Sequence, residues 1–437
     1  MCGECLAQGK SSDTSWDHSF AFHSPAAPAV PPYLERFSPS MRFFTCTPVA
    51  FGGGPDFFAR DSGLLCRGFQ ALGIESRAVM PGDRKPEDEE DLIRTDYSNL
   101  ESAEWWKSQD LDGVMLYAWG RPRFRKVAKA IHDAGIFLVL NQDNGGLVSP
   151  LAGFGDWFSE QWILAGQGRG PDAVFRFLKL TAKGLTTGIF LTDPLRAAHL
   201  KQGNIIACVS PKAADCYRKL CRIYGGTDLA DRVKVIPHAV EGRFQFSGLL
   251  KRRQVACVGR WQDIRQKRPW LLIEVIGALV AADEEVSVVI VGMVTEELAG
   301  WHRSLDPSSR DRVHLRGPAG REDLAEILRE SQMFFSPSAF ESFGIAAAEA
   351  LCSGCSIVAG RSISMASFDW FVSADSGTLA KGDAAVDYLA AIQQELTMWE
   401  QAARRPAEIS RIWRSRLHAD QVAGLVLETY NEHKLEK

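Results

Sequence analysis

Two glutamates near the end of the chain have unlike surroundings. Glu341 lies in a loop that reaches Gly344, whereas Glu349 lies in the Ala-rich run that follows Ile345. A helix that begins near Ile345 presents unpaired amides at its first turn, and such amides bind anions. We therefore expect the amides of Phe343, Gly344 and Ile345 to hold the phosphates of a nucleotide.

The two carboxylates then predict hydrogen bonds to sugars. Glu341, in the turn, is placed to accept hydrogen bonds from the hydroxyl groups of a sugar. Glu349 is placed to accept hydrogen bonds from both hydroxyls of a ribose. The alternative for Glu349 is a solvated helix face. The alanines around it are typical of a packed helix, in which an unpaired carboxylate would be costly.

A basic segment, "VGRWQDIRQKRP" (258–269), supplies the opposite charge. Gly259 and Arg260 follow an apolar run, and Lys267 precedes a helical stretch. Arginine offers a planar fork and lysine a point charge to a diphosphate. A basic surface loop is the alternative, because Arg265 and Arg268 stand in the same segment.

Short apolar runs separated by helical stretches must position these residues. Such runs are typical of parallel strands that are buried on both faces. Helices are expected over 56–72, 267–282 and 321–331, and over most of 384–432. The strands are predicted at 41–46, 78–80, 113–119, 136–142, 205–210, 232–240, 254–260, 286–292, 313–317, 333–338 and 355–360.

This alternation predicts an α/β protein with two doubly wound Rossmann-like domains that face each other across a cleft. Ligands of such domains bind at the carboxyl ends of the strands. Residues 1–40 are rich in proline and predict a disordered extension. The predicted parts are 1–40, a first Rossmann-like domain over 41–245, a second over 246–405, and a helix over 406–437 that packs back on the first domain.

"PSAFESFGIAAAEALCSG", with Glu341 and Glu349 eight positions apart, resembles the signature of retaining family 4 glycosyltransferases of GT-B fold. "VGRW" followed by "KRP" is similar to the Gly-Arg and Lys segment of that family. "VKVIPHAVEGRF" resembles its interdomain segment, with His238 and Ala239 in place of the usual Asn and Gly. The resemblance extends from about 205 to 360 and is weaker in the first domain.

The resemblance implies that the first domain, 41–245, binds the acceptor and that the second, 246–405, binds the nucleotide sugar. It also implies a role for each matched residue. Arg260 and Lys267 would neutralise the diphosphate of a UDP- or GDP-linked sugar. Glu341 would hold the donor sugar and Glu349 the ribose. The loop Gly52-Gly53-Gly54 would approach the donor phosphate or the acceptor. The family retains anomeric configuration through front-face attack, without a metal, a cofactor or a protein nucleophile.

The sequence departs from the family pattern at several points. The spacing from Arg260 to Lys267 is two residues longer than usual, and Lys267 is chosen because it precedes the helix. Asn141, Asp143 or Asn144 could stand in for a histidine that many relatives carry in the first domain, although Asp143 fits a turn equally well. His238 is interpreted as a linker residue rather than a catalyst.

Composition excludes several protein classes. The net charge of −4 gives no broad electrostatic case for nucleic-acid binding. No apolar run is long enough to span a membrane, and no secretory signal is recognised, so we expect a cytoplasmic enzyme with a nucleotide-sugar donor and an unidentified acceptor. The CxxC pairs Cys2/Cys5 and Cys352/Cys355 are interpreted as reduced thiols, and the acidic run 87–91 as a solvated loop or helix start.

Aromatic segments at 156–164 and 174–185 could contact the inner face of a membrane or an apolar acceptor, but packing within the domain is favoured. Two rival functions remain at this point. One is a sugar phosphorylase or glucan-synthase-like enzyme of the same fold. The other is a non-catalytic scaffold that binds sugar nucleotides.

Overall fold

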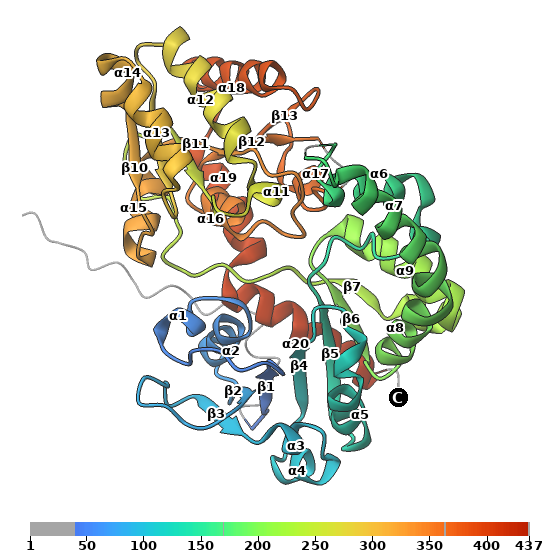
Figure 1. Cartoon of the computed structure of the whole chain (residues 1–437). Coiled ribbons are helices and arrows are strands. Elements are labelled where there is room, and N and C mark those ends of the chain that lie inside the picture. Colours follow the sequence, from blue (N-terminus) through green and yellow to red (C-terminus); the bar gives the residue numbers. More distant parts are fainter. Residues whose placement is uncertain (1–39, 169, 362–363, 436–437) are drawn as a thin grey trace, which may run out of the picture. The chain divides into compact units, whose positions relative to one another are not determined.

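The computed structural model describes residues 40–168, 170–361 and 364–435. They form two parallel sheets with helices on both faces of each (Figure 1). This architecture confirms the predicted α/β class with two Rossmann-like domains. All but the last residue of the predicted extension, 1–40, lies outside the described residues.

The first sheet has seven parallel strands in the order β3-β2-β1-β4-β5-β6-β7. The chain order reverses between β1 and β4, where Thr45 pairs with Met115. Its strands are β1 Phe43–Cys46, β2 Ala78–Pro81, β3 Leu92–Thr95, β4 Gly113–Tyr117, β5 Phe137–Gln142, β6 Ile205–Cys208 and β7 Val233–Val235. Its helices are α1 Pro55–Phe58, α2 Asp61–Ala71, α3 Tyr97–Leu100, α4 Ala103–Ser108, η2 Pro122–Phe124, α5 Arg125–Asp133, η3 Pro150–Ala152, α6 Phe154–Ala165, α7 Ala173–Lys183, η4 Gly184–Thr192, α8 Asp193–Leu200, α9 Pro211–Gly225 and α10 Thr227–Asp231.

The second sheet has six parallel strands in the order β10-β9-β8-β11-β12-β13. Its order reverses between β8 and β11, where Met333 pairs with Val255. Its strands are β8 Arg252–Val258, β9 Ser287–Val291, β10 Val313–Arg316, β11 Ser331–Ser336, β12 Ser356–Gly360 and β13 Gly377–Ala380. Its helices are α11 Ile264–Lys267, α12 Pro269–Ala282, α13 Glu296–Ser304, α14 Pro307–Arg312, α15 Arg321–Glu330, α16 Ile345–Cys352, α17 Phe368–Phe371 and α18 Ala385–Glu400, followed by α19 Pro406–Leu417 and α20 Ala419–Leu435.

The acidic run 87–91 is not a solvated loop throughout, which corrects the sequence-based expectation. Asp88 is buried and pairs with Arg94 of β3 at 2.8 Å. The hydrogen bond from Arg94 lowers the pKa of Asp88 to about 2. Arg94 also donates to the carbonyl of Phe51 at 2.8 Å, and a Cβ on Gly53 would lie 2.2 Å from Asp88 Oδ1. The pair therefore holds the glycine loop against β3.

The end of the chain divides between the two sheets. Residues 406–437, expected as one helix, contain α19 and α20 with an extended residue, His418, between them. Trp413 of α19 lies in the core under the second sheet. Tyr430 of α20 packs against Phe43 and Phe137 of the first sheet, with ring centroids 6.2 and 5.2 Å away. The two helices thus link the hydrophobic cores of both sheets.

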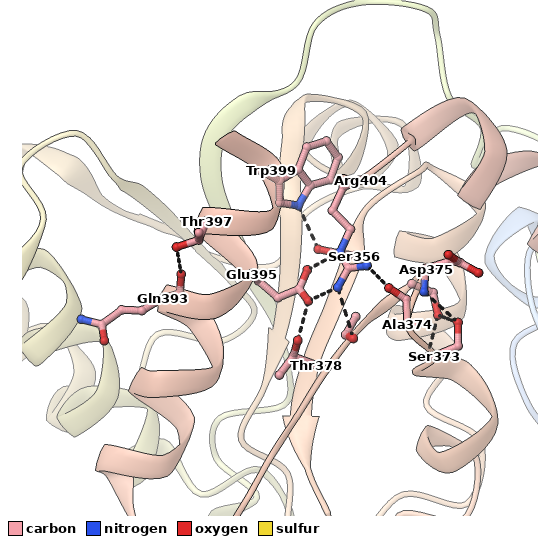
Figure 2. A network of polar contacts seen from close by, with 12 residues as sticks. Ser356, Ser373, Ala374, Asp375, Thr378, Gln393, Glu395, Thr397, Trp399 and Arg404 are labelled. Carbon is pink, nitrogen blue, oxygen red and sulfur yellow. Dashed lines mark hydrogen bonds and ion pairs between the residues drawn. The ribbon is translucent and has the colours of Figure 1, made fainter. Parts of the chain in front are cut away.

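A buried ion pair fixes the outer edge of the second sheet (Figure 2). Arg404, just before α19, pairs with Glu395 of α18, and the two side chains are 2 and 0% exposed. Thr378 of β13 donates to Glu395 at 2.6 Å. The guanidinium also donates to the carbonyls of Ala374 and Gly377. One ion pair therefore joins α18, β13 and the start of α19.

Eight cysteines among the described residues are free and buried. Cys355 donates to the carbonyls of Leu328 and Ser331 at 3.0 and 3.2 Å, and Cys352 belongs to the core beside α19. Packing therefore accounts for this CxxC pair. Cys2 and Cys5 lie outside the described residues. In the part of the chain that is described, no helix is both long and apolar enough to cross a membrane.

Candidate functional site

A cavity of about 610 Å³ lies where the order of the second sheet reverses. Gly259 and Arg260 follow β8, and Glu341 follows β11, so the carboxyl ends of neighbouring strands bring them to one wall. Asp143, from the loop after β5 of the first sheet, also lines the cavity. A ligand site is expected at such a reversal of strand order.

The first turn of α16 forms the floor of this cavity. Gly344 caps the helix with φ of 81°, and a Cβ there would lie 3.0 Å from the ring of Phe368. Glycine is therefore the residue that this turn accommodates. Phe343, Gly344 and Ile345, whose amides were predicted to hold phosphates, all line the cavity, and the amides at a helix start have no intrahelical acceptor.

Glu341 and Lys267 meet each other across the cavity wall. The Lys267 ammonium pairs with Glu341 Oε1, which also accepts from the Ser338 hydroxyl at 2.9 Å. Gln266 donates to Glu341 Oε2 at 3.3 Å. The structure therefore brings the two predicted residues together, but it shows them bound to one another.

The remaining basic residues separate into different roles. Arg260 lines the cavity with its side chain 69% exposed and donates to Gln266 Oε1 at 3.1 Å. Arg268 is buried and donates to the carbonyl of Pro337 at 2.5 Å, so it stabilises the loop that follows β11. Arg265 is exposed and is not among the residues that line the cavity. This placement favours Lys267 over both competitors.

Glu349 is buried in the cavity wall and paired, unlike a solvated helix carboxylate. Arg321, the first residue of α15, donates to Glu349 at 2.7 Å and pairs with Glu241 at 3.2 Å. Burial raises the pKa of Glu349, although Arg321 opposes the shift. The Arg321 guanidinium stacks over the Phe244 ring at 4.7 Å. Sequence reasoning missed Arg321, whose only signal was its place at a helix start after a strand and glycines.

Asp143 and His238 form a second charged pair in the cavity, and His238 lies in the segment that joins the two sheets, between β7 and β8. His238 Nε2 lies 3.1 Å from Asp143 Oδ2, and the ring is 1% exposed. Burial by itself lowers the pKa of His238, but the Asp143 carboxylate outweighs this and the net pKa is raised. Ser342, from the second sheet, donates to Asp143 Oδ1 at 2.7 Å.

Two features of the first domain that were expected in the site do not line the cavity, and one residue that was not expected does. Asn144 does not line the cavity: it exchanges hydrogen bonds with the Tyr217 hydroxyl at 2.8 and 3.0 Å. The loop of Gly52, Gly53 and Gly54 is likewise not among the lining residues. Arg60, which was not among the predicted residues, lines the cavity. Its positive charge acts against the net rise in the pKa of both Glu349 and His238.

Comparison with known proteins gives one family match. Residues 252–397 match the model of the family described as glycosyl transferases group 1. These residues carry the cavity wall that holds Arg260, Lys267, Glu341 and Glu349. No curated protein sequence matches the chain.

Solved structures resemble nearly the whole chain. The lipopolysaccharide outer core galactosyltransferase WaaB is 13% identical with a TM-score of 0.59, over 90% of this chain and 100% of that chain. HepE of Anabaena, in complex with UDP and glucose, is 13% identical with a TM-score of 0.56, over 90 and 100%. Sucrose-phosphate synthase of Thermosynechococcus elongatus is 15% identical with a TM-score of 0.54, over 91 and 100%. These likenesses show the GT-B fold.

Proposed function

We propose that this chain is a retaining, metal-independent glycosyltransferase, because its residues 252–397 match the family described as glycosyl transferases group 1 and its fold is GT-B. It would move a sugar from a nucleoside diphosphate to an acceptor hydroxyl. One observation carries the proposal. The first turn of α16, the cations Arg260 and Lys267 and the carboxylates Glu341 and Glu349 all line one cavity at the switch point of the second sheet.

Each part of the donor has a matching group in the cavity. The amides of Gly344 and Ile345 would bind the diphosphate, together with Arg260 and Lys267. Glu349, held by Arg321, would accept the ribose hydroxyls. UDP is the proposed nucleotide, because the similar HepE was solved with UDP.

The charges also fit the bond changes of the reaction. The bond between the anomeric carbon and the diphosphate oxygen breaks, and its electron pair stays on the diphosphate. The acceptor oxygen bonds to the anomeric carbon on the same face, and its proton passes to the departing phosphate oxygen. Negative charge therefore grows on the diphosphate, where Arg260, Lys267 and the helix amides stabilise it. No cofactor takes part in this scheme.

Substitution of the two best-placed residues tests the proposal. Glu349→Ala should weaken UDP binding about tenfold to a hundredfold, because a hydrogen bond to a charged group is lost. Lys267→Ala should lower turnover about a hundredfold or more, with a smaller effect on binding. Calorimetry with UDP measures the first effect, and release of nucleoside diphosphate from a panel of UDP- and GDP-sugars measures the second.

Arg265→Ala is the matched control, since it removes one exposed positive charge two residues from Lys267. It should bind UDP and turn over like the parent. A thermal-shift comparison of all variants separates loss of the site from loss of the fold. Parent-like binding and turnover in both Glu349→Ala and Lys267→Ala would show that the assigned roles are wrong.

A further inference from the structure

Exposed apolar side chains are concentrated in one part of the first domain. Eleven of the 22 large apolar side chains that are exposed among the described residues lie between Leu151 and Leu195. The sequence favoured packing within the domain for these aromatic segments, and the structure shows Trp157 buried but Phe158 and Trp162 more than one third exposed. Exposed apolar side chains that gather on neighbouring elements, here α6, α7 and η4, are typical of an interaction site.

Helix α6 carries the first stripe of this surface. Phe154, Phe158 and Trp162 recur every four residues, so they share one side of the helix, and they are 56, 39 and 38% exposed. The rings of Phe158 and Trp162 meet Phe177 of α7 at 4.9 and 5.3 Å. These contacts hold α6 and α7 together as one unit.

Helix α7 and the π-helix η4 continue the surface. Phe175 and Leu178 lie about one turn apart on α7 and are 69 and 58% exposed. None of the nine residues of η4 is buried, and Phe190 within it is 80% exposed. We call the following six residues the apolar patch: Phe154, Phe158, Trp162, Phe175, Leu178 and Phe190.

Basic residues flank the apolar patch. Lys179 and Lys183 are exposed, and their helical positions lie next to the stripe of Phe175 and Leu178. Residues 173–192 contain three basic residues and no acidic one, although the whole chain has a net charge of −4. On α6, Asp156 is exposed, and burial raises the pKa of Glu160 to about 8.

We propose that the apolar patch docks on the surface of a lipid bilayer that contains anionic lipids. An exposed apolar stripe beside a lysine stripe is the arrangement of helices that lie in the membrane interface. Anionic headgroups attract the lysines while the aromatic rings enter the acyl boundary. A second copy of the chain suits the patch less, because it would set lysines against lysines. This proposal does not depend on the transfer reaction.

Vesicle flotation tests the docking directly. The parent protein should float with vesicles of phosphatidylcholine that contain about one third phosphatidylglycerol, and markedly less with phosphatidylcholine alone. The triple variant Phe175→Ser, Leu178→Ser, Phe190→Ser should bind anionic vesicles about tenfold more weakly or worse, because three insertions are lost. Lys179→Glu with Lys183→Glu should remove the dependence on anionic lipid and on salt.

The matched control is Leu250→Ser with Val386→Ser, which changes side chains that are 97 and 69% exposed outside the patch. It should float like the parent. All substituted positions are exposed, so circular dichroism should show unchanged folds. The proposal is overturned if the parent ignores anionic vesicles, or if the triple variant floats like the parent. It is equally overturned if ultracentrifugation shows a parent dimer that the triple variant loses while vesicles are ignored.

Discussion

The carboxylate of Glu341 is held by three donors. Lys267 and Ser338 donate to one oxygen and Gln266 to the other. A diphosphate that approaches Lys267 must therefore share the ammonium group with Glu341, since both are anions. As negative charge grows on the diphosphate, the Lys267 ammonium interacts more strongly with the diphosphate and less with Glu341. This is why Lys267 is expected to act on turnover more than on ground-state binding.

The pair of His238 and Asp143 predicts a pH dependence. The folded-state pKa of His238 is raised, so its stabilising effect is complete below the unfolded-state pKa of about 6.5 and is lost as pH rises through the folded-state pKa. Asp143, Asp61 and Arg60 are the charged groups that act on this ring. The difference in unfolding free energy between the parent and His238→Gln should be about 1–3 kcal/mol near pH 6 and smaller near pH 9.

Urea unfolding at several pH values measures this difference. His132→Gln is the control, because His132 is exposed on α5, and its difference from the parent should stay near zero at each pH. A difference for His238→Gln that does not change with pH would mean that the ring is not charged in the folded protein.

At the scale of elements, the edge of the second sheet depends on Glu395 and Arg404. Either single change, Glu395→Gln or Arg404→Met, leaves a buried charge without its partner. Each should lower the free energy of unfolding by about 3–5 kcal/mol, as measured by urea denaturation. Arg405→Met, at a neighbouring exposed arginine, should have little effect.

The double variant distinguishes the ion pair from simple packing. Glu395→Gln with Arg404→Met removes both charges, so it should be more stable than the sum of the single losses implies. Strict additivity of the two losses would contradict the interpretation that Glu395 and Arg404 stabilise each other as an ion pair.

Buried strands were predictable from the sequence, but two of the four edge strands were not. Eleven apolar runs predicted strands of the two sheets, because strands covered on both faces are apolar throughout. β3 and β13 lie at sheet edges. Their residues, "LIRT" and "GTLA", lack such a run and were missed. The helix expected over 56–72 is divided, because Asp61 has φ of 46° and starts α2 anew.

The donor side of the site followed from local order, whereas the opposite wall did not. Arg260, Glu341 and Glu349 lie next to strand ends and a helix start, which the sequence displays. His238 and Arg60 reach the cavity only through the packing of distant segments, so no local pattern indicates them. Arg321, on the donor side, had only its place at a helix start as a signal. Asn144 illustrates the converse error, because its partner Tyr217 is 73 residues away.

At the scale of the whole molecule, the chain crosses between the sheets twice. His238 lies in the first crossing, between β7 and β8, and Val240 pairs with His418 of the second, between α19 and α20. Val240 N donates to the carbonyl of Leu417 at 2.7 Å. The two crossings therefore lie side by side. A change in the relative position of the sheets would act on both at once, close to the His238 and Asp143 pair.

The burial of the cysteines turns them into built-in reporters of local opening. Burial raises the pKa of each described thiol, to about 11 for Cys216, and only the thiolate reacts with alkylating reagents. Iodoacetamide should therefore label the native protein far more slowly than the urea-unfolded one, at rates set by transient exposure. Mass spectrometry can then follow Cys46 and Cys208 for the first sheet separately from Cys257 and Cys352 for the second. Equal labelling rates in native and unfolded protein would refute the burial. Unequal rates for the cysteines of the first and second sheets would show which domain opens locally more often.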